Sequence, residues 1–330
     1  MKTWDIFYQN IVQSGLVKSK DKVVLAVSGG QDSICMLHMF WRLAKKMQIE
    51  LLTVNFNHNL RKESAKEAQI VKNLSNKLGI DCILENINVK EYSKKESISI
   101  ETAGRNLRYL SLENIAKKYK YNKISTAHNA NDNAETVLMW LLRGSGNFAG
   151  IPQERNIGKK LSIIRPLLPI KRKLIEDYIS MHKLPFCTDK SNFSDVYTRN
   201  KIRLSIIPLC EKINTMAVEH IFNLSHIHAI ENAYLEEITL KCLKKCVKFS
   251  KRQILLDLTM FLQYNEAVQY RILKNILPQK KYNSYINLIM YKILSSDLSI
   301  YKISDDWSFC VKSNNKAYFI KGKENDREAI

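Results

Sequence analysis

The stretch that decides the fold is Val23-Val24-Leu25-Ala26-Val27-Ser28-Gly29-Gly30-Gln31-Asp32-Ser33. Its first five residues are apolar and predict a short strand buried inside a parallel sheet. Two glycines follow directly, and apolar residues then recur at helical spacing from Ile34 to Ala44. The stretch therefore predicts a strand, a tight loop and a helix N-terminus, an arrangement that binds anions.

The side chains of this loop indicate the kind of anion. Ser28 and Ser33 supply hydroxyl donors, whereas the carboxylate of Asp32 would repel a bare phosphate unless a cation lay between them. A metal–nucleotide complex fits this combination. The loop lacks the Gly-Lys-Ser/Thr ending of a Walker loop and the spacing of a dinucleotide fingerprint. The alternative interpretation is a plain strand–turn–helix corner.

Strands and helices alternate through the first part of the chain. Further strands are predicted at 50–56, 82–89 and 123–127, and a fifth at the sheet edge over 162–165. Helices are predicted to start near residues 64, 100 and 134, with Ser64 as an N-cap, and residues 91–99 are predicted to be an exposed loop. The alternation predicts an α/β fold, a doubly wound parallel sheet of about five strands.

Past residue 169 the predicted elements are mainly helices. Helical spacing covers 171–182, about 214–247, 253–264, 267–277 and 285–294, and two short strands over 300–321 turn at Asn314-Asn315. We place a domain boundary near residue 212. This predicts a catalytic domain at 1–212 and a mainly helical accessory domain at 213–330.

Composition restricts the partners and the compartment. A formal net charge of +20 on 330 residues favours a polyanionic partner such as RNA, although a lysine-rich proteome would give the same excess. The seven cysteines are scattered and form no Cys-x-x-Cys pair, which argues against a disulfide framework and against a zinc or iron–sulfur site. No signal peptide or membrane span is predicted, so we expect an intracellular protein.

Two further clusters carry charged side chains at helical spacing. Asp132 and Glu135 are three residues apart, so a helix would place both carboxylates on one face, where they could hold an ammonium group or a metal. The alternative is a helix N-terminus with acids favoured by the dipole. Arg105 and Arg108 have the same spacing and could clamp a phosphate, or they could belong to a solvated helix face.

Taken in order, these motifs resemble those of the N-type ATP pyrophosphatases, and among them the tRNA(Ile)-lysidine synthetases. The resemblance covers roughly the first 210 residues. The matching segments are 28–33, Asn57-His58-Asn59-Leu60-Arg61, Ser64 with Glu67-Ala68, 101–109, 126–146, Arg165-Pro166-Leu167-Leu168 and 189–203. Asn131 departs from the family pattern, because an acid is common at that position.

The resemblance implies an ATP-dependent ligase that joins L-lysine to C2 of the wobble cytidine in a tRNA(Ile) with a CAU anticodon. The C2 oxygen is first adenylated with release of pyrophosphate, and the lysine ε-amine then displaces AMP. It also implies ATP and Mg²⁺ as cofactors, a homodimer, and a bacterial cytoplasm, with an organelle as the alternative. The accessory region would bind tRNA and would end before the last domain of longer members.

The resemblance also assigns roles to individual residues. The ATP-binding residues would be Ser28, Gly29, Gly30, Gln31, Asp32 and Ser33, together with Ala26 at the end of the strand. Asp32 would hold Mg²⁺ and Arg105 would contact the ATP phosphates or the adenylate. Asp132 and Glu135 would hold the lysine. The residues that would contact the tRNA or the nucleotide are His128, Arg143, Arg199 and Arg203.

Two other functions are compatible with parts of the sequence. A tRNA thiolase of the same superfamily also adenylates a pyrimidine oxygen, but such enzymes usually carry cysteine pairs that are missing here. A catalytically inactive RNA-binding protein would share the basic charge. The complete Ser28–Ser33 loop and the pair Asp132 and Glu135 argue against it.

Overall fold

The computed structural model describes residues 2–57, 64–144, 148–187, 198–277, 282–304 and 306–322. It divides into two compact units, unit 1 (Met1–Ala229) and unit 2 (Ile230–Ile330). The division falls inside helix α10 (Ala217–Cys246), beyond the boundary predicted near residue 212. Within the described ranges, no helix is long and apolar enough to cross a membrane.

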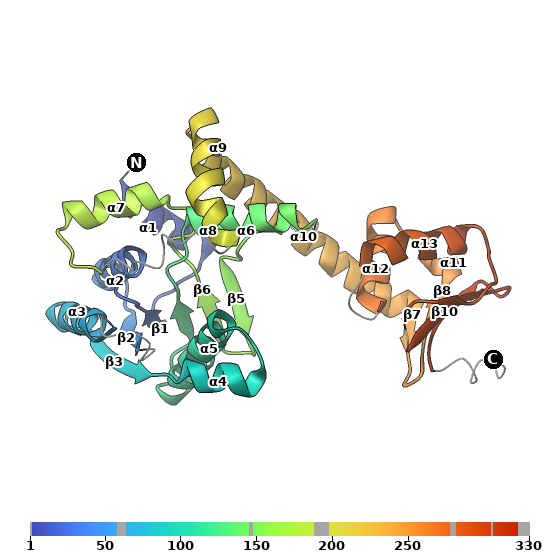
Figure 1. Cartoon of the computed structure of the whole chain (residues 1–330), viewed down its shortest axis with the longest axis horizontal. Coiled ribbons are helices and arrows are strands. Elements are labelled where there is room, and N and C mark those ends of the chain that lie inside the picture. The colour runs from blue at the N-terminus through green and yellow to red at the C-terminus, as the bar shows by residue number, and fades with distance from the viewer. Residues whose placement is uncertain are drawn as a thin grey trace. The chain divides into compact units, whose positions relative to one another are not determined.

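Unit 1 is built on a six-stranded sheet with the order β3-β2-β1-β4-β6-β5 (Figure 1). The strands are β1 (Lys22–Ala26), β2 (Glu50–Asn57), β3 (Asp81–Asn86), β4 (Lys123–Ser125), β5 (Glu154–Ile157) and β6 (Leu161–Ile164). All neighbours pair in parallel except β5 and β6. The chain order reverses between β1 and β4, and ligands of doubly wound sheets bind beside such a reversal.

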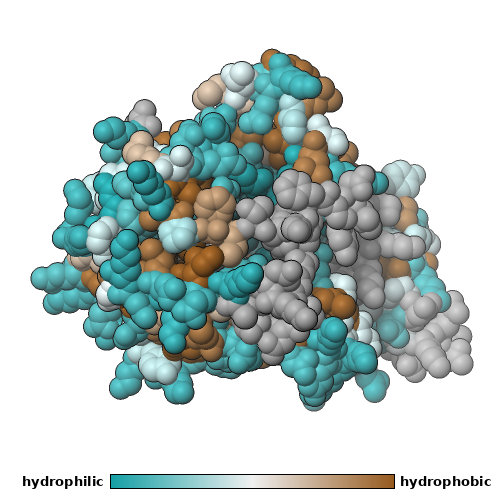
Figure 2. All heavy atoms as spheres, turned by 60° about the vertical axis from the view of Figure 1, so that its left-hand side comes forward, coloured by the Kyte–Doolittle hydropathy of each residue, from teal (hydrophilic) through white to brown (hydrophobic). Residues whose placement is uncertain are grey.

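Helices cover both faces of this sheet, as predicted. The helices of unit 1 are α1 (Thr3–Ser14), α2 (Gln31–Ala44), α3 (Ser64–Lys77), α4 (Val89–Glu96), α5 (Ile100–Lys118), α6 (Ala130–Leu142), α7 (Arg172–Met181), α8 (Thr198–Lys201), the π-helical turn η2 (Ile202–Ile206), α9 (Ile207–Ile213) and the start of α10. Figure 2 shows the side of α2, α3 and α7, where hydrophilic side chains surround smaller apolar patches.

The alternation of side chains along β1 explains the two helical layers. Val23 and Leu25 belong to a core with Phe40 of α2, whereas Val24 belongs to a second core with Leu112 of α5. All three β1 residues are fully buried. A central strand covered on both faces needs a continuous apolar run, and this is why the opening stretch predicted the fold correctly.

Two predictions for unit 1 were wrong. Residues 91–99 are mostly helical rather than an exposed loop, because they fall largely in α4, which Asn88 caps by accepting a hydrogen bond from Glu91 N at 3.3 Å. Only Val89 is buried in this helix, so the sequence shows no helical period. The predicted fifth strand, now β6, is not at the edge, because β5 pairs with it in antiparallel orientation. β5 is mostly exposed and polar, so its sequence lacks the alternation of apolar residues from which a strand is predicted.

Unit 2 combines helices with a five-stranded antiparallel sheet of order β7-β8-β11-β10-β9. Its elements are the end of α10, β7 (Val247–Phe249), β8 (Gln253–Asp257), α11 (Leu258–Phe261), α12 (Glu266–Ile276), α13 (Tyr282–Leu294), β9 (Tyr301–Lys302), β10 (Trp307–Lys312) and β11 (Lys316–Lys321). The predicted last hairpin is confirmed, and Asn315 at its turn has φ +56°.

The helix predicted over 253–264 was wrong for most of its length. Gln253–Asp257 form β8, in which Ile254 and Leu256 are buried and pair with β11, and only α11 is helical. The apolar residues of this stretch satisfy a period of two as well as a helical period. The partner strand, some 60 residues later in the chain, decides between the two patterns.

Candidate functional site

The loop after β1 has the predicted strand–loop–helix geometry. Gly29 has φ +95°, a conformation that favours glycine, and Gly30 is the N-cap of α2. The Ser33 hydroxyl ties the loop together, since it accepts from Ser28 N and Gly29 N at 3.2 Å each and donates to Gly30 O at 2.9 Å. Ser28 is exposed. The loop thus presents the α2 N-terminus and the Ser28 side chain to a ligand, whereas Ser33 mainly holds its shape.

Asp32 lies in the first turn of α2, and its Oδ1 atom is buried without a hydrogen-bond partner among the described residues. The pKa of Asp32 is raised to about 6, mainly by burial and also by the charge of Asp132, although Arg172 opposes both effects. A buried carboxylate oxygen with no partner, next to a second carboxylate, suits a divalent cation. Mg²⁺ is typically held by one or two carboxylates together with phosphate oxygens, so Asp32 fits it.

Asp132 is fixed by the cap of α6. Asn129 Oδ1 accepts from Asp132 N at 3.0 Å, and Asp132 Oδ2 accepts from Asn129 N at 3.1 Å. This capping box starts α6 at Ala130, a few residues earlier than predicted. One carboxylate oxygen is thereby used in the cap, and Oδ1 accepts a hydrogen bond from Arg203 Nη2 at 3.3 Å.

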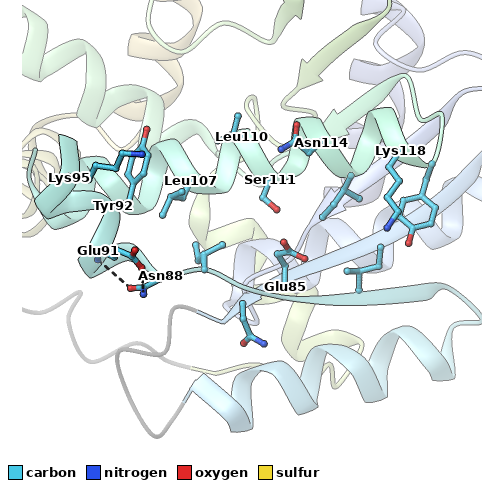
Figure 3. A pocket seen from close by; sticks show the side chains of 15 residues that line it. Glu85, Asn88, Glu91, Tyr92, Lys95, Leu107, Leu110, Ser111, Asn114 and Lys118 are labelled. Atoms are coloured by element: carbon cyan, nitrogen blue, oxygen red, sulfur yellow. Dashed lines mark hydrogen bonds between the residues drawn. The ribbon is translucent and has the colours of Figure 1, made fainter.

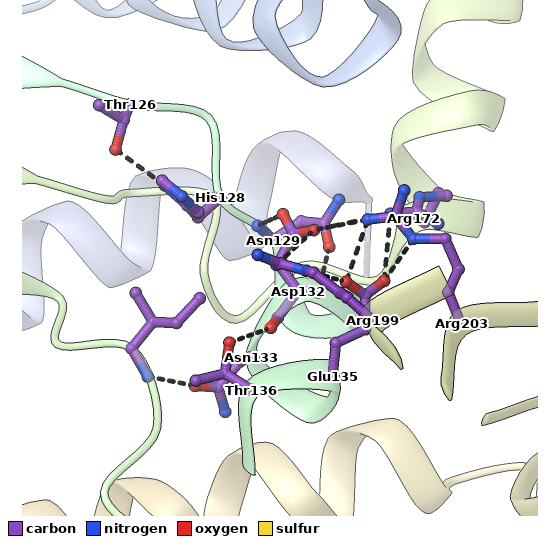
Figure 4. A network of polar contacts seen from close by, with 11 residues as sticks. Thr126, His128, Asn129, Asp132, Asn133, Glu135, Thr136, Arg172, Arg199 and Arg203 are labelled. Atoms are coloured by element: carbon purple, nitrogen blue, oxygen red, sulfur yellow. Dashed lines mark hydrogen bonds and ion pairs between the residues drawn. The ribbon is translucent and has the colours of Figure 1, made fainter. Parts of the chain in front are cut away.

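Asp132 and Glu135 share one face of α6, as their spacing predicted, and three arginines contact them (Figure 4). Arg203 binds Glu135 through Nε–Oε1 at 2.5 Å and Nη2–Oε2 at 3.0 Å, and Arg199 Nε lies 2.7 Å from Oε2. Asp132 Oδ1 lies 3.3 Å from Arg203, 3.6 Å from Arg199 and 3.7 Å from Arg172. The Glu135 side chain is completely buried and that of Asp132 is 13% exposed.

These ion pairs change the expectation for two residues. Arg199 and Arg203 were predicted to face tRNA or nucleotide, but in this structure their guanidiniums neutralise Glu135. Direct contact between Glu135 and a ligand would require them to leave it. Arg172 was missed, because it stands in the basic run Lys171-Arg172-Lys173, which has the composition of a solvated helix start.

His128 lies among arginines at the carboxyl ends of β4 and β6. Its Nδ1 is 3.0 Å from Thr126 Oγ1. Burial and, to a smaller extent, four nearby cations lower the pKa of His128 to about 3, so the imidazole is neutral. These cations are Arg165, Arg105, Arg199 and Arg108. The predicted residues Arg105, His128 and Arg199 are therefore brought to one basic region.

Arg165 is the central member of this region that the sequence analysis did not assign. It directly follows β6 and is 3% exposed. Its Nη1 donates to Pro152 O at 2.6 Å, but its buried Nε has no partner within the described part of the chain. Tyr109 has Arg105 and Arg155 each 5.3 Å from its ring centroid. Arginines held this closely together favour a polyanionic ligand.

Some predicted residues are not brought to the site or lie outside the described residues. Arg143 caps the far end of α6, about 16 Å along the helix from Asp132. Residues 58–61 and 189–197 and the side chain of Ser64 lie outside the described residues. A pocket of about 610 Å³ between β3, α4 and α5 contains none of the predicted site residues (Figure 3). It is lined by residues such as Glu85, Tyr92 and Leu110.

Asn133, next to Asp132 on α6, links this helix to two other segments. It is fully buried, its Nδ2 donates to Ser225 Oγ of α10 at 2.8 Å, and its Oδ1 accepts from Ile151 N at 2.7 Å. The backbone beside Ile151 comes so close that a Cβ on Gly150 would lie 2.1 Å from Asn133 Oδ1. This close approach requires glycine at position 150.

We therefore expect Gly150→Ala to lower the free energy of unfolding by about 2–4 kcal/mol, since it combines a clash with a strained φ of +64°. The matched control is Gly158→Ala, which has φ +65° and nothing within 4 Å of the added Cβ, so it should cost only about 1 kcal/mol. Urea unfolding measures both values. Equal losses in the two variants would contradict the proposed clash.

A doubly wound sheet with a glycine loop after its central strand and carboxylates at the next strand end defines a nucleotide-binding α/β domain. A family model described as PP-loop domain matches residues 3–210, and the chain belongs to this family.

Curated relatives confirm the resemblance to lysidine synthetases. The chain is 40% identical over 228 residues to a "tRNA(Ile)-lysidine synthase" of Thermosipho africanus (strain TCF52B), covering 69% of this chain and 52% of the relative. It is 35% identical over 277 residues to a protein of the same name from Clostridioides difficile (strain 630), covering 82% and 59%. The chain thus spans between half and three fifths of the length of these relatives.

A solved structure shares the fold. It is the U34-tRNA thiolase NcsA from Methanococcus maripaludis with its [4Fe-4S] cluster, with a TM-score of 0.59, 19% identity, and coverage of 68% of this chain and 77% of that one.

Proposed function

We propose that this chain catalyses the ATP-dependent joining of L-lysine to C2 of the wobble cytidine in a tRNA(Ile) with a CAU anticodon, with release of pyrophosphate and AMP. The observation that carries the proposal is the similarity to lysidine synthases, together with a PP-loop domain match over residues 3–210 that contains Asp32, Asp132 and Glu135. The structure supports it, because β1 and β4 are neighbours and bring these carboxylates to one sheet edge.

In the first step, the cytidine O2 attacks the α-phosphorus of ATP and the bond to pyrophosphate breaks. The loop 28–33 and the α2 N-terminus would hold the leaving pyrophosphate, because N–H groups and the helix dipole stabilise its charge. Mg²⁺, held by Asp32, would supply Lewis-acid neutralisation of this charge. Arg105 would contact the phosphates or the adenylate.

In the second step, the lysine ε-amine attacks C2, the C2–O bond breaks, and the oxygen leaves with AMP. The ε-amine must be neutral to attack, and it carries an additional proton after the new C–N bond has formed. The Oδ1 atom of Asp132, which lies 3.3 Å from Arg203, would hold the amino group and accept this proton. Glu135 would contribute by holding Arg199 and Arg203.

The basic region around His128 supports an RNA substrate. Its arginines lie on the same sheet edge as the loop, and the buried Arg165 Nε lacks a partner within the described residues. Phosphate oxygens of the anticodon loop would accept hydrogen bonds from these arginines. The homodimer and the bacterial cytoplasm remain predictions.

A tRNA thiolase is the second candidate, since NcsA shares the fold. Thiolases usually carry cysteine pairs, and the part of the chain that the structure describes holds no group of three or more His, Cys, Asp or Glu side chains arranged to bind a metal ion. All seven cysteines are free.

The assay incubates the full chain with ATP, Mg²⁺, labelled lysine and an in vitro transcript of the CAU-anticodon isoleucine tRNA. We expect label on the tRNA together with an equal amount of AMP. Absence of lysine incorporation by the folded protein would refute the proposal. Incorporation of label from a sulfur donor instead would establish thiolation.

We expect Asp132→Ala to reduce lysine transfer by about 10²–10³-fold and adenylation less, because Asp132 would act on the amine. The two steps are separated by measuring pyrophosphate release without lysine and labelled tRNA with it. Asp177→Ala is the control, because Asp177 is exposed and pairs with Lys173 on the outer face of α7. An equal loss of both steps would remove the proposed role of Asp132.

A further inference from the structure

The pocket between β3, α4 and α5 lies where the sheet of unit 1 ends. β3 is an edge strand: it pairs with β2 and makes no other backbone hydrogen bond to the described residues. Figure 3 shows the pocket open at this edge, with α5 above the strand. Leu110 of α5, which lines the pocket, is 50% exposed, because no further strand covers it. The pocket thus occupies the place that one more strand would take beneath α5.

The size and the shape of this pocket suit a short extended chain. Its volume is about 610 Å³, within the range of about 300–1,000 Å³ that holds organic ligands. Alternate residues of β3, from Ile83 to Ile87, line one side, and α5 lines the other from Leu107 to Lys118. At 1.5 Å per residue this part of α5 is about 16 Å long. A strand of about five residues has the same length.

Three charged side chains are spaced along the pocket. Glu85 lies in the middle and points toward α5, with Lys95 at one end and Lys118 at the other (Figure 3). Glu85 is partly buried, both lysines are exposed, and none of the three has an ion pair within the described ranges. The carboxylate of Glu91, which also lines the pocket, already accepts from Asn88 Nδ2 at 2.8 Å. The pocket therefore favours a ligand with a central cation and an anion at each end.

We propose that this pocket, which the proposed lysine ligation does not use, binds an extended segment of a partner protein that pairs with the free edge of β3. The segment carries a basic residue with an acidic residue two positions before it and another two positions after it. Side chains two residues apart in a strand point to the same side, about 6.6 Å from one another. The basic side chain thus meets Glu85, while the acidic side chains face Lys95 and Lys118.

Two features of the pocket support a peptide rather than a small cation. The unpaired backbone of β3 can exchange hydrogen bonds with an added strand, and such strand addition supplies affinity while the side-chain pockets supply specificity. The walls formed by Leu107 and Leu110 suit the aliphatic stem of a lysine or arginine side chain, whose charged end then reaches Glu85. A small organic cation would use only the second feature and would be repelled by the two lysines.

The test measures binding of two fluorescent synthetic peptides to the full chain by fluorescence anisotropy. The first is Glu-Val-Arg-Val-Glu with blocked termini, and in the second a Glu replaces the central Arg. We expect the wild type to bind the first peptide at least about 10-fold more tightly than the second. Glu85→Gln, which keeps the shape of the side chain, should lose this preference. Glu85→Lys should reverse it.

Glu113→Gln is the matched control, because Glu113 lies on the same helix, pairs with Lys117 and does not line the pocket. It should keep both wild-type Kd values. Absence of binding at about 1 mM peptide, or equal Kd values of the two peptides for the wild type, would refute the inference. Argininamide that binds as tightly as the first peptide would refute it in favour of a small-cation site. A wild-type dimer in sedimentation that Glu85→Lys dissociates would refute it in favour of a second copy of this chain.

Discussion

Asp32→Asn should reduce pyrophosphate and AMP release by about 10³-fold or more. The Oδ1 atom of Asp32 is buried without a partner among the described residues, beside the loop that would hold the departing pyrophosphate. Asparagine keeps the shape of the side chain but cannot neutralise a cation there. The measurement is pyrophosphate release at saturating ATP and tRNA. Asp177→Asn, an exposed substitution on α7, is the control.

The same substitution should stabilise the fold at neutral pH. The pKa of Asp32 is raised from 3.8 to about 6, so the folded state holds this proton more tightly than the unfolded state. The ionised carboxylate therefore destabilises the fold above pH 6, and this penalty is absent below pH 3.8. In a chelator, Asp32→Asn should gain up to about 3 kcal/mol at pH 7.5 and nothing at pH 3.5. A loss of stability at pH 7.5 would show that Asp32 has a structural partner.

Glu135→Gln should lower the free energy of unfolding by about 3 kcal/mol and release Arg199 and Arg203. The Glu135 carboxylate is completely buried and neutralises both guanidiniums, which are 34% and 20% exposed. A neutral amide would remove the close partner of two partly buried cations and leave them the longer contacts with Asp132, at 3.6 Å and 3.3 Å. Urea unfolding, followed by tryptophan fluorescence, measures this loss.

The control for Glu135→Gln is Glu113→Gln. Glu113 pairs with Lys117 at 2.6 Å, but both side chains are partly or largely exposed, so less than about 1 kcal/mol should be lost. If Glu135 acts by positioning the arginines, Glu135→Gln should reduce the binding free energy for tRNA or lysine by less than it reduces the free energy of unfolding. A stable Glu135→Gln variant that cannot transfer lysine would instead favour direct contact with the substrate.

The parts of the site that depend on local sequence were predictable. Gly29, Gly30 and Asp32 follow a buried strand and open a helix, so backbone geometry alone places them at the sheet edge. Asp132 and Glu135 share a helix face because of their spacing. The α4 helix and the β8 strand were not predictable. The first has only one buried residue, and the second depends on pairing with a strand far along the chain.

The sequence alone determined the α/β class, the glycine loop after β1, the acidic pair and the resemblance to lysidine synthetases, because each depends on neighbouring residues or short spacings. Only the tertiary structure decided how these groups are neutralised. Arg203 contacts Asp132 and Glu135, which lie 71 and 68 residues earlier in the sequence. Arg172 contacts the same carboxylates from α7. Packing decides such contacts between segments, because no local pattern specifies which distant side chain will fill the space beside a buried charge.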